Sequence, residues 1–258
     1  MSTQLSLLGK DHYLSTYEFG RELILTEDLD PVYVILYRAK LQETQLMRLL
    51  LAYWMFYSLG TAARCVEDRC FYDNVDSAAR NKDPRGTERR HFRGEACFKS
   101  IAWFKKNFPK PEDAVRSLKK YRSFLEVREA VMQWPLFGPW IAFKVADMLE
   151  RVLDWPIDFS DCDLLSFYQE PKAGAEILAE KENTTPEAAL AKLLKQFSRT
   201  AAPPSQNRQC GIQEIETILC KWKSYLHGHY WIGKDWHEIK NGLEGKGHLA
   251  ERLLEVAR

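Results

Sequence analysis

Apolar side chains recur at helical spacing through most of the chain. From Leu46 to Tyr57 they fall at steps of three and four residues, which is the period of an α-helix. The uncharged run from Leu49 to Ala63 is too short to cross a hydrocarbon layer of about 30 Å. We therefore expect this run to form a buried helix.

Two later stretches, 141–152 and 212–222, also carry apolar residues on one helical face. No stretch shows the sustained alternation of apolar and polar residues that a half-buried strand requires. The pattern therefore predicts an all-α fold. Prolines divide the chain into pieces of helix length, at Pro135, Pro139, Pro156, Pro171, Pro203 and Pro204.

Two polar stretches are expected to connect helices. Asn81–Gly94 contains a proline and two glycines, and we interpret it as a charged loop that enters a helix. Thr200–Gln209 is interpreted as an exposed connection. A chain of 258 residues is long enough for one large domain or for two closely packed lobes.

Charge is balanced over the whole chain, with 37 Lys and Arg against 36 Asp and Glu. Net charge therefore gives no sign of a nucleic-acid partner, and only its distribution can do so. Between Arg85 and Arg122 basic residues clearly outnumber acidic ones. A surface that binds nucleic acid is one interpretation of this segment, and a solvated helical surface is the other.

The six cysteines contain no CxxC pair, and the chain shows no signal-peptide pattern. Free thiols, a reducing compartment and a cytoplasmic location are therefore expected, with no membrane partner. Cys210, Cys220, His227 and His229 match no standard zinc-finger spacing.

The segment Trp134–Ala142, with the sequence WPLFGPWIA, is a proline-rich turn that runs directly into a predicted helix. Such a turn exposes unpaired backbone N–H groups at the positive end of a helix dipole, where phosphate binds. The alternative is an ordinary structural turn.

A second polar pattern lies in the predicted helix after Arg208. Glu214, Thr217 and Lys221 fall on one face at helical spacing, apart from the apolar stripe. A carboxylate, a hydroxyl and an amine are thereby aligned. Without other information, such a face is solvated and carries an ordinary salt pair.

WPLFGPWIA resembles the LPGxGxxTA hairpin of the helix-hairpin-helix DNA glycosylases. Gly138 stands at the second glycine and Ala142 at the closing alanine, whereas Leu136 replaces the first glycine. In that superfamily an aspartate follows at an interval that here leads from Trp140 to Asp158. The resemblance implies a glycosylase-like helical unit over 1–258, with the hairpin element at about 125–153 and a C-terminal helical segment at about 208–258.

Two departures limit what this resemblance implies. Trp140 stands where the base-excision lyases keep a lysine nucleophile, which excludes Schiff-base chemistry at this position. The four-cysteine iron–sulfur loop of some members is also absent from the sequence. A repurposed glycosylase fold is therefore favoured over plain glycosylase activity.

Three segments together resemble one family over roughly residues 30–236: ERRHFRG, LLAYWMFYSLG and EIETILCKWKS…GHYWIGKD. This is the α-glutamyl/putrescinyl thymine pyrophosphorylase family of bacteriophages, also described as amino acid:DNA transferases. The resemblance implies that an amine displaces pyrophosphate from the 5-methylene carbon of 5-pyrophosphoryloxymethyluracil in DNA. Its partners would be double-stranded DNA with this modified pyrimidine and a free amino acid or amine.

The chemistry of this reaction suggests roles for individual residues. A departing pyrophosphate requires fixed positive charge, and the base must leave the stack to reach an enclosed site. A carboxylate would assist the attacking amine, and hard oxygen ligands would suit magnesium, although no cofactor is certain. The candidates are Arg89, Arg90, His91 and Arg93 for pyrophosphate or phosphate; Phe137, Gly138, Trp140 and Lys144 for DNA; Asp158 and Glu214 for catalysis; Lys221 and Lys234 for the amino acid; and Asp161 and Asp163 for a metal.

Two other functions stay open at this point. A DNA glycosylase that removes a modified pyrimidine would use the same hairpin and aspartate, and a non-catalytic helical DNA-binding module would use the hairpin alone. The sequence has no GxxxxGK[ST] loop, which argues against a kinase of the P-loop type.

Overall fold

The computed structural model describes residues 13–68 and 70–257. Within these ranges the secondary structure consists of helices and two isolated bridges, Ser123–Asp158 and Ala201–Gln209, which confirms the predicted all-α class. Residues 1–12, where a leader would lie, are outside the described residues. No helix in the described ranges combines the length and apolar character needed to cross a membrane.

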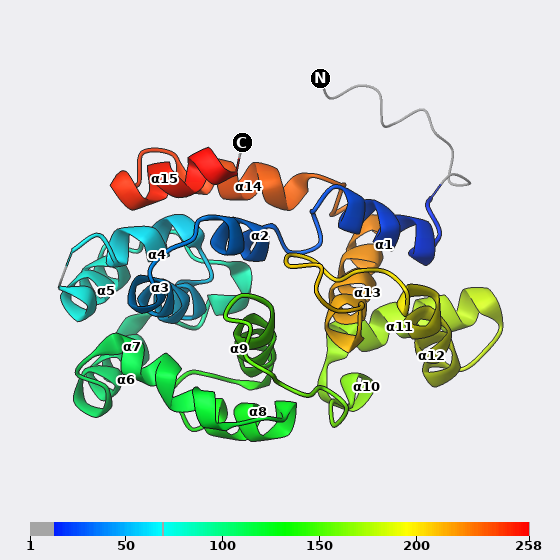
Figure 1. Ribbon diagram of the computed structural model, residues 1–258, viewed down its shortest axis with the longest axis horizontal. Helices are drawn as coiled ribbons and strands as arrows, with labels where there is room; N and C mark the ends of the chain where they lie inside the picture. Colours follow the sequence, from blue (N-terminus) through cyan, green and yellow to red (C-terminus); the bar gives the residue numbers. More distant parts are fainter. Residues whose placement is uncertain (1–12, 69, 258) are drawn as a thin grey trace. The chain divides into compact units, whose positions relative to one another are not determined.

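The chain divides into two compact units. The larger unit comprises 30–163 and 235–258, and the smaller unit comprises residues up to Leu29 together with 164–234. Figure 1 shows the helices of both units. The larger unit contains α2 (Pro31–Arg38), α3 (Glu43–Phe56), α4 (Leu59–Cys65), α5 (Phe71–Arg80), η1 (Thr87–Arg89), α6 (Gly94–Asn107), α7 (Pro111–Arg116), η2 (Ser117–Lys120), α8 (Phe124–Met132), α9 (Pro139–Arg151), α14 (Lys234–Leu243, from its second residue) and α15 (His248–Val256). The smaller unit contains α1 (Thr16–Leu25), α10 (Leu164–Phe167), α11 (Gln169–Glu182), α12 (Pro186–Phe197) and α13 (Ile212–Leu226).

The apolar run 49–63 forms two helices, so the expectation of one buried helix is wrong in its continuity. Tyr57 ends α3 in the left-handed conformation at φ 51°, and its backbone N–H donates to the Tyr53 carbonyl. Ser58 then starts α4 and accepts a hydrogen bond from the Thr61 N–H. The run is buried as expected, because α3 and α4 both lie in the core.

Buried charges join the core helices of the larger unit. The Arg151 guanidinium contacts Asp30 at 2.7 Å and Asp147 at 3.4 Å, and the Tyr33 hydroxyl donates to Asp147 at 2.9 Å. Burial, followed by the charges of Asp147 and Asp30, raises the pKa of Tyr33 well above its usual value. This network fixes the start of α2 against α9, because a buried charge without its partner would cost several kcal/mol.

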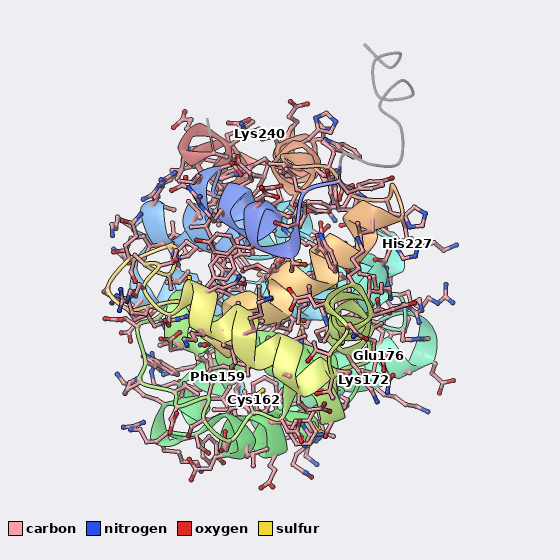
Figure 2. The ribbon with its side chains drawn as sticks, turned by 90° about the vertical axis from the view of Figure 1, so that its right-hand side faces the viewer. Phe159, Cys162, Lys172, Glu176, His227 and Lys240 are labelled. Carbon is pink, nitrogen blue, oxygen red and sulfur yellow. The ribbon has the colours of Figure 1, made fainter. Side chains whose placement is uncertain are left out.

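The helix α13 is the central element of the smaller unit and contacts both α1 and α11. Two glycines permit these contacts: a Cβ on Gly20 would lie 2.9 Å from the Ile218 side chain, and one on Gly174 would lie 2.5 Å from the Leu219 carbonyl oxygen. Figure 2 shows Lys172 and Glu176 on α11 and His227 just after α13.

The C-terminal helices complete the larger unit. Figure 1 shows α15, drawn in red, and this helix contacts α2 and α4. The Glu67 carboxylate accepts from the His248 N–H at 2.8 Å at the start of α15. Gly60 lies so close to α14 that a Cβ would approach the Gly242 carbonyl oxygen to 1.9 Å. The packing of α4 on α14 therefore requires a glycine at this position.

Candidate functional site

The segment at which the sequence predicts a hairpin forms α8, a turn over 133–138 and α9. Ser123 and Glu126 form a capping box that starts α8, and Pro139 occupies the first turn of α9. The apolar face expected over 141–152 is buried, although α9 is also buried on most of its other sides. The structure thus contains a helix, a turn and a helix at the segment that the sequence singled out.

The two positions of the glycine motif differ in backbone conformation. Leu136, which stands at the first glycine position of the motif, has φ 67°, in the left-handed region that favours glycine. Gly138 has φ −92°, which any residue adopts, and a Cβ there would meet nothing within 4 Å. Neither backbone strain nor internal packing therefore requires a glycine at position 138.

Aromatic packing and a side-chain hydrogen bond hold the turn in place. Phe137 is buried and its ring lies 5.3 Å from Trp134 and 5.5 Å from Phe104. The Ser100 hydroxyl donates to the Pro135 carbonyl at 2.8 Å. The backbone N–H groups at the start of α9 are consequently presented by a rigid turn.

Arg89 connects this turn to α3. Its Nη1 donates to the Leu136 carbonyl at 2.8 Å and its Nε donates to the Met55 carbonyl at 3.0 Å. The side chain lies over the Phe137 ring and is only 5% exposed, and burial lowers its pKa to about 10. Its Nη2 is buried without a hydrogen-bond partner in the described residues. Arg89 thus stays charged at neutral pH and holds the hairpin by its backbone.

A hollow of about 570 Å³ lies along the turn, and we call it the hairpin hollow. Glu88, Arg89 and His91 line it together with residues 132–141. The other two cations of the ERRHFRG motif, Arg90 and Arg93, are exposed on the loop that carries η1. Three arginines and one histidine thus belong to one short segment, in which Arg89 is buried and the other three side chains are exposed.

Trp140 and Lys144 occupy different environments on α9. Trp140 is half-buried, lines the hairpin hollow, and contacts the edge of the Tyr57 ring at 4.8 Å. Lys144 is only 5% exposed, with its ammonium group 5.3 Å from the Phe143 ring. A residue this buried is poorly placed for a phosphate of DNA.

Asp158 is tied to the start of α8. Its backbone N–H donates to the Arg122 carbonyl at 2.7 Å, and its carbonyl accepts from the Phe124 N–H at 2.8 Å. The exposed carboxylate accepts from the Ser160 hydroxyl at 2.7 Å and from the Ser160 N–H at 2.8 Å, and these bonds lower the pKa of Asp158. The side chain is therefore held in its charged form.

The loop after Asp158 carries Asp161 and Asp163, the two residues that the sequence suggests as metal ligands. Figure 2 shows Phe159 and Cys162 in this loop. Asp161 accepts from the Leu125 N–H at 3.3 Å, as a cap of α8 would, while Asp163 lies exposed before α10. Within the described residues, no group of three or more His, Cys, Asp or Glu side chains is arranged to hold a metal ion.

Glu214 lies in the smaller unit at the first turn of α13 and is fully buried. Its carboxylate accepts two hydrogen bonds from the Arg208 guanidinium, at 2.8 and 3.1 Å, and one from the Gly211 N–H at 2.8 Å. Thr217 is buried as well, so this face of α13 is not the solvated face that the default interpretation describes. These contacts are those of a helix cap.

Lys221 and Lys234 donate to two loops of the smaller unit, and the Asp28 carboxylate joins these loops. Lys221 Nζ donates to the Asp28 carbonyl at 2.5 Å, and Lys234 Nζ donates to the His229 carbonyl at 2.8 Å. The buried Asp28 carboxylate accepts from the Tyr230 hydroxyl and from the Gly233 N–H, both at 2.6 Å. The two ammonium groups therefore stabilise the loop backbone.

The sequence did not reveal a second hollow of about 410 Å³ in the larger unit, which we call the tyrosine hollow. Tyr33, Tyr53 and Tyr57 line it with Glu88 and one face of α14. The apolar periodicity places the tyrosines of α3 in the core, and the sequence gives Glu88 no role beyond its position in ERRHFRG. Their approach to α14 depends on contacts across more than 140 residues, which no local pattern indicates.

Comparison with known proteins identifies the class to which this protein belongs. A sequence model of the family described as "Amino acid:DNA transferase" matches residues 20–231. The chain is 40% identical to a glycinyltransferase of Pseudomonas phage PaMx11, across 88% of this chain and 89% of that protein. It is 29% identical to a putrescinyltransferase of Delftia phage PhiW-14, across 88% of this chain and 78% of that protein.

These matches show that the helical fold and the hairpin described above belong to a transferase that acts on DNA. The chain belongs to the amino acid:DNA transferase family. Membership confirms the family expected from the ERRHFRG, LLAYWMFYSLG and C-terminal segments. It also favours transfer over the two alternatives, base removal and non-catalytic DNA binding. Its substrates are DNA and an amino acid or amine.

Proposed function

We propose that this transferase couples an amino acid or amine to the 5-methylene carbon of 5-pyrophosphoryloxymethyluracil in duplex DNA. In this reaction the amine nitrogen forms a bond to the methylene carbon, and the carbon–oxygen bond to pyrophosphate breaks. The bonding electron pair leaves with pyrophosphate, and the amine loses a proton. The observation that carries the proposal is the hairpin hollow, whose turn is fixed in place beside the cations of ERRHFRG.

The hairpin supports a role in binding the DNA backbone. The first backbone N–H groups of α9 have no intrahelical acceptor and lie at the positive end of the helix dipole. Gly138 precedes them with no side chain of its own, and the space where its Cβ would stand is open. Contacts of this kind position a duplex but carry no sequence information. Selectivity would then come from the modified base.

The leaving group supports a role for the exposed cations. Negative charge accumulates on pyrophosphate as the bond breaks, and fixed positive groups stabilise that charge. Arg90, His91 and Arg93 are exposed and able to reach it, and arginine suits phosphate oxygens particularly well. Buried Arg89 would act through the hairpin that it holds.

The surroundings of Asp158 and Glu214 favour different roles for these two carboxylates. Asp158 is stabilised in its charged form, which makes it a weak proton acceptor but a suitable group to stabilise cationic character at the methylene carbon. Glu214 is already engaged by Arg208 and Gly211, so we assign it a structural role. Lys144 is buried, and Lys221 and Lys234 donate to backbone carbonyls. We therefore leave these three lysines outside the reaction.

The reacting base lies beside stacked neighbours in a duplex. Turning it out of the stack costs a few kcal/mol, which contacts with the hairpin and with the half-buried Trp140 would offset. This step would resemble the one used by glycosylases, without cleavage of the glycosidic bond.

The test is mass spectrometry of nucleosides from duplex DNA that carries 5-pyrophosphoryloxymethyluracil, after incubation with the enzyme and a mixture of amino acids and putrescine. An aminomethyl adduct supports the proposal and identifies the donor. Free modified base with abasic sites would show base removal instead. Substrate that is bound but unaltered would contradict both reactions.

A further inference from the structure

The tyrosine hollow has the size of a small-molecule site. Its volume of about 410 Å³ falls within the range of about 300–1,000 Å³ that is typical of such sites. Its walls come from the start of α2, the turn between α3 and α4, the loop before η1, and α14. On α14 the lining residues Asp235, Glu238, Ile239 and Gly242 follow helical spacing, so one face of that helix forms a wall.

The lining of this hollow is strongly acidic. It contains four carboxylates, from Asp30, Glu88, Asp235 and Glu238, and one guanidinium, from Arg85. Asp30 already pairs with the buried Arg151 guanidinium, and Arg85 keeps its charge while it donates to the Phe92 carbonyl. In a chain with 37 basic and 36 acidic residues, this is a local concentration of negative charge. Such a lining attracts cations and repels the phosphates of DNA.

Glu88 is the carboxylate best placed to meet a ligand. Its Oε2 lies over Gly86, 2.8 Å from where a Cβ would stand, and Tyr57 borders the same point. Within the described residues, no protein group donates a hydrogen bond to this carboxylate or forms an ion pair with it. Burial and Tyr57 raise the pKa of Tyr53, and the charges of Glu88 and Asp30 raise it further, so both carboxylates act on the same phenol.

The tyrosine rings supply a second attraction for a cation. An ammonium group over the face of a tyrosine ring gains about 0.5–2 kcal/mol, depending on desolvation. The Arg151 guanidinium already lies over the Tyr33 ring, 4.6 Å from its centroid, and Tyr53 is buried with its ring 4.7 Å from that of Tyr57. The half-buried Tyr57 is therefore the ring that a ligand would meet. Packing against Tyr53 and Trp140 holds the Tyr57 ring in place in this lining.

The tyrosine hollow adjoins the hairpin hollow. Glu88 lines both hollows, and Tyr57 of one contacts Trp140 of the other at 4.8 Å. A small cation in the first would therefore lie next to a nucleotide in the second. A divalent metal ion suits the lining less well, because no cluster of three or more ligands is arranged for one in the described residues.

We propose that the tyrosine hollow binds the amine donor, with the ammonium group of the donor on the Glu88 carboxylate. The proposal rests on the proposed function and names the site of its second substrate. Glu88 would accept one proton from the ammonium, which frees the nitrogen lone pair. That pair forms the bond to the methylene carbon as the pair of the breaking carbon–oxygen bond leaves with pyrophosphate.

The experiment is steady-state kinetics of transfer with Glu88→Gln, in which amine and DNA concentrations are varied separately. The matched control is Glu95→Gln, an exposed carboxylate on α6 that lines neither hollow. Glu88→Gln is expected to raise the KM for the amine about ten- to hundredfold, the worth of one hydrogen bond to a charged group. The KM for DNA is expected to stay within about twofold, and Glu95→Gln to resemble the wild type.

An unchanged amine KM, or an equal rise in both KM values, would overturn the assignment. If the wild type forms no adduct, the proposed function fails. Calorimetry with putrescine and the protein alone then tests whether the tyrosine hollow binds an amine. Putrescine binding that weakens in Glu88→Gln and not in Glu95→Gln would support the site. Binding that is absent from the wild type, or equal in both variants, would overturn it. Thermal melting confirms that each variant is folded.

Discussion

The guanidinium of Arg89 donates a hydrogen bond of 2.8 Å to the carbonyl oxygen of Leu136, the turn residue that has a left-handed backbone. This contact links the ERRHFRG motif to the hairpin and fixes a conformation that a leucine adopts at a cost of about 1–2 kcal/mol. The two motifs that the sequence indicated separately are therefore one structural element.

Arg89→Met is expected to lower the free energy of unfolding by about 2–4 kcal/mol. The change leaves the Leu136 and Met55 carbonyls without their charged donor, and each such loss costs about 1–3 kcal/mol. Denaturant unfolding measures the effect. Arg90→Met, at the exposed neighbouring position, is expected to stay within about 0.5 kcal/mol of the wild type. Equal stability of the two variants would contradict this role of Arg89.

Gly138→Val is expected to weaken duplex binding about tenfold or more with little loss of stability. The backbone at position 138 suits any residue and the added side chain meets no protein atom, so folding is not obstructed. The side chain would instead stand in front of the N–H groups of α9. Fluorescence anisotropy with a labelled duplex measures binding, and thermal melting measures stability. Unaltered affinity would show that DNA does not approach this turn.

Ser160→Ala is expected to move the acid limb of the pH–rate profile to higher pH. The Ser160 hydroxyl favours the charged form of Asp158, so its loss raises the pKa of that carboxyl toward the ordinary value. Asp158 then protonates at a higher pH, and transfer that requires its charge falls earlier on acidification. NMR titration of Asp158 verifies the shift, and Ser198→Ala serves as the control. A raised pKa with an unmoved acid limb would remove Asp158 from the reaction.

Duplex affinity is expected to fall steeply with salt, because the chain carries almost no net charge and must rely on local cations. Arg90→Gln and Arg93→Gln are each expected to reduce the slope of log affinity against log salt by about one. Arg21→Gln, an exposed arginine of the smaller unit, is the control and should leave the slope unchanged. Slopes that do not differ among the three variants would place the DNA elsewhere.

Local patterns were sufficient to predict much of the fold. Helical periodicity located α9 and α13, and the proline and glycine signals located the loop before α6 and the hairpin turn. They did not reveal the break at Tyr57, because the composition of 49–63 is uniformly apolar and a left-handed tyrosine has no sequence signal. They also described 200–209 as exposed, whereas Ala202 is buried.

The site was less accessible to sequence reasoning. Lys144 and Glu214 are charged residues at helical positions that a pattern assigns to a polar surface, yet long-range packing buries both. Arg89 and Arg90 are neighbours with the same chemistry, and only the fold distinguishes the buried donor from the exposed one. The tyrosine hollow depends on α14 meeting the loop that carries Glu88, which is set by tertiary packing alone.

The central claim is that the reacting nucleotide binds in the hairpin hollow. The most direct measurement is photocrosslinking of a duplex that carries 5-iodouracil at the position of the modified base, with the cross-linked peptide identified by mass spectrometry. The account predicts attachment within residues 132–141, at Trp140 above all, or at His91. Attachment confined to peptides outside this hollow, such as those of residues 208–234, would contradict it.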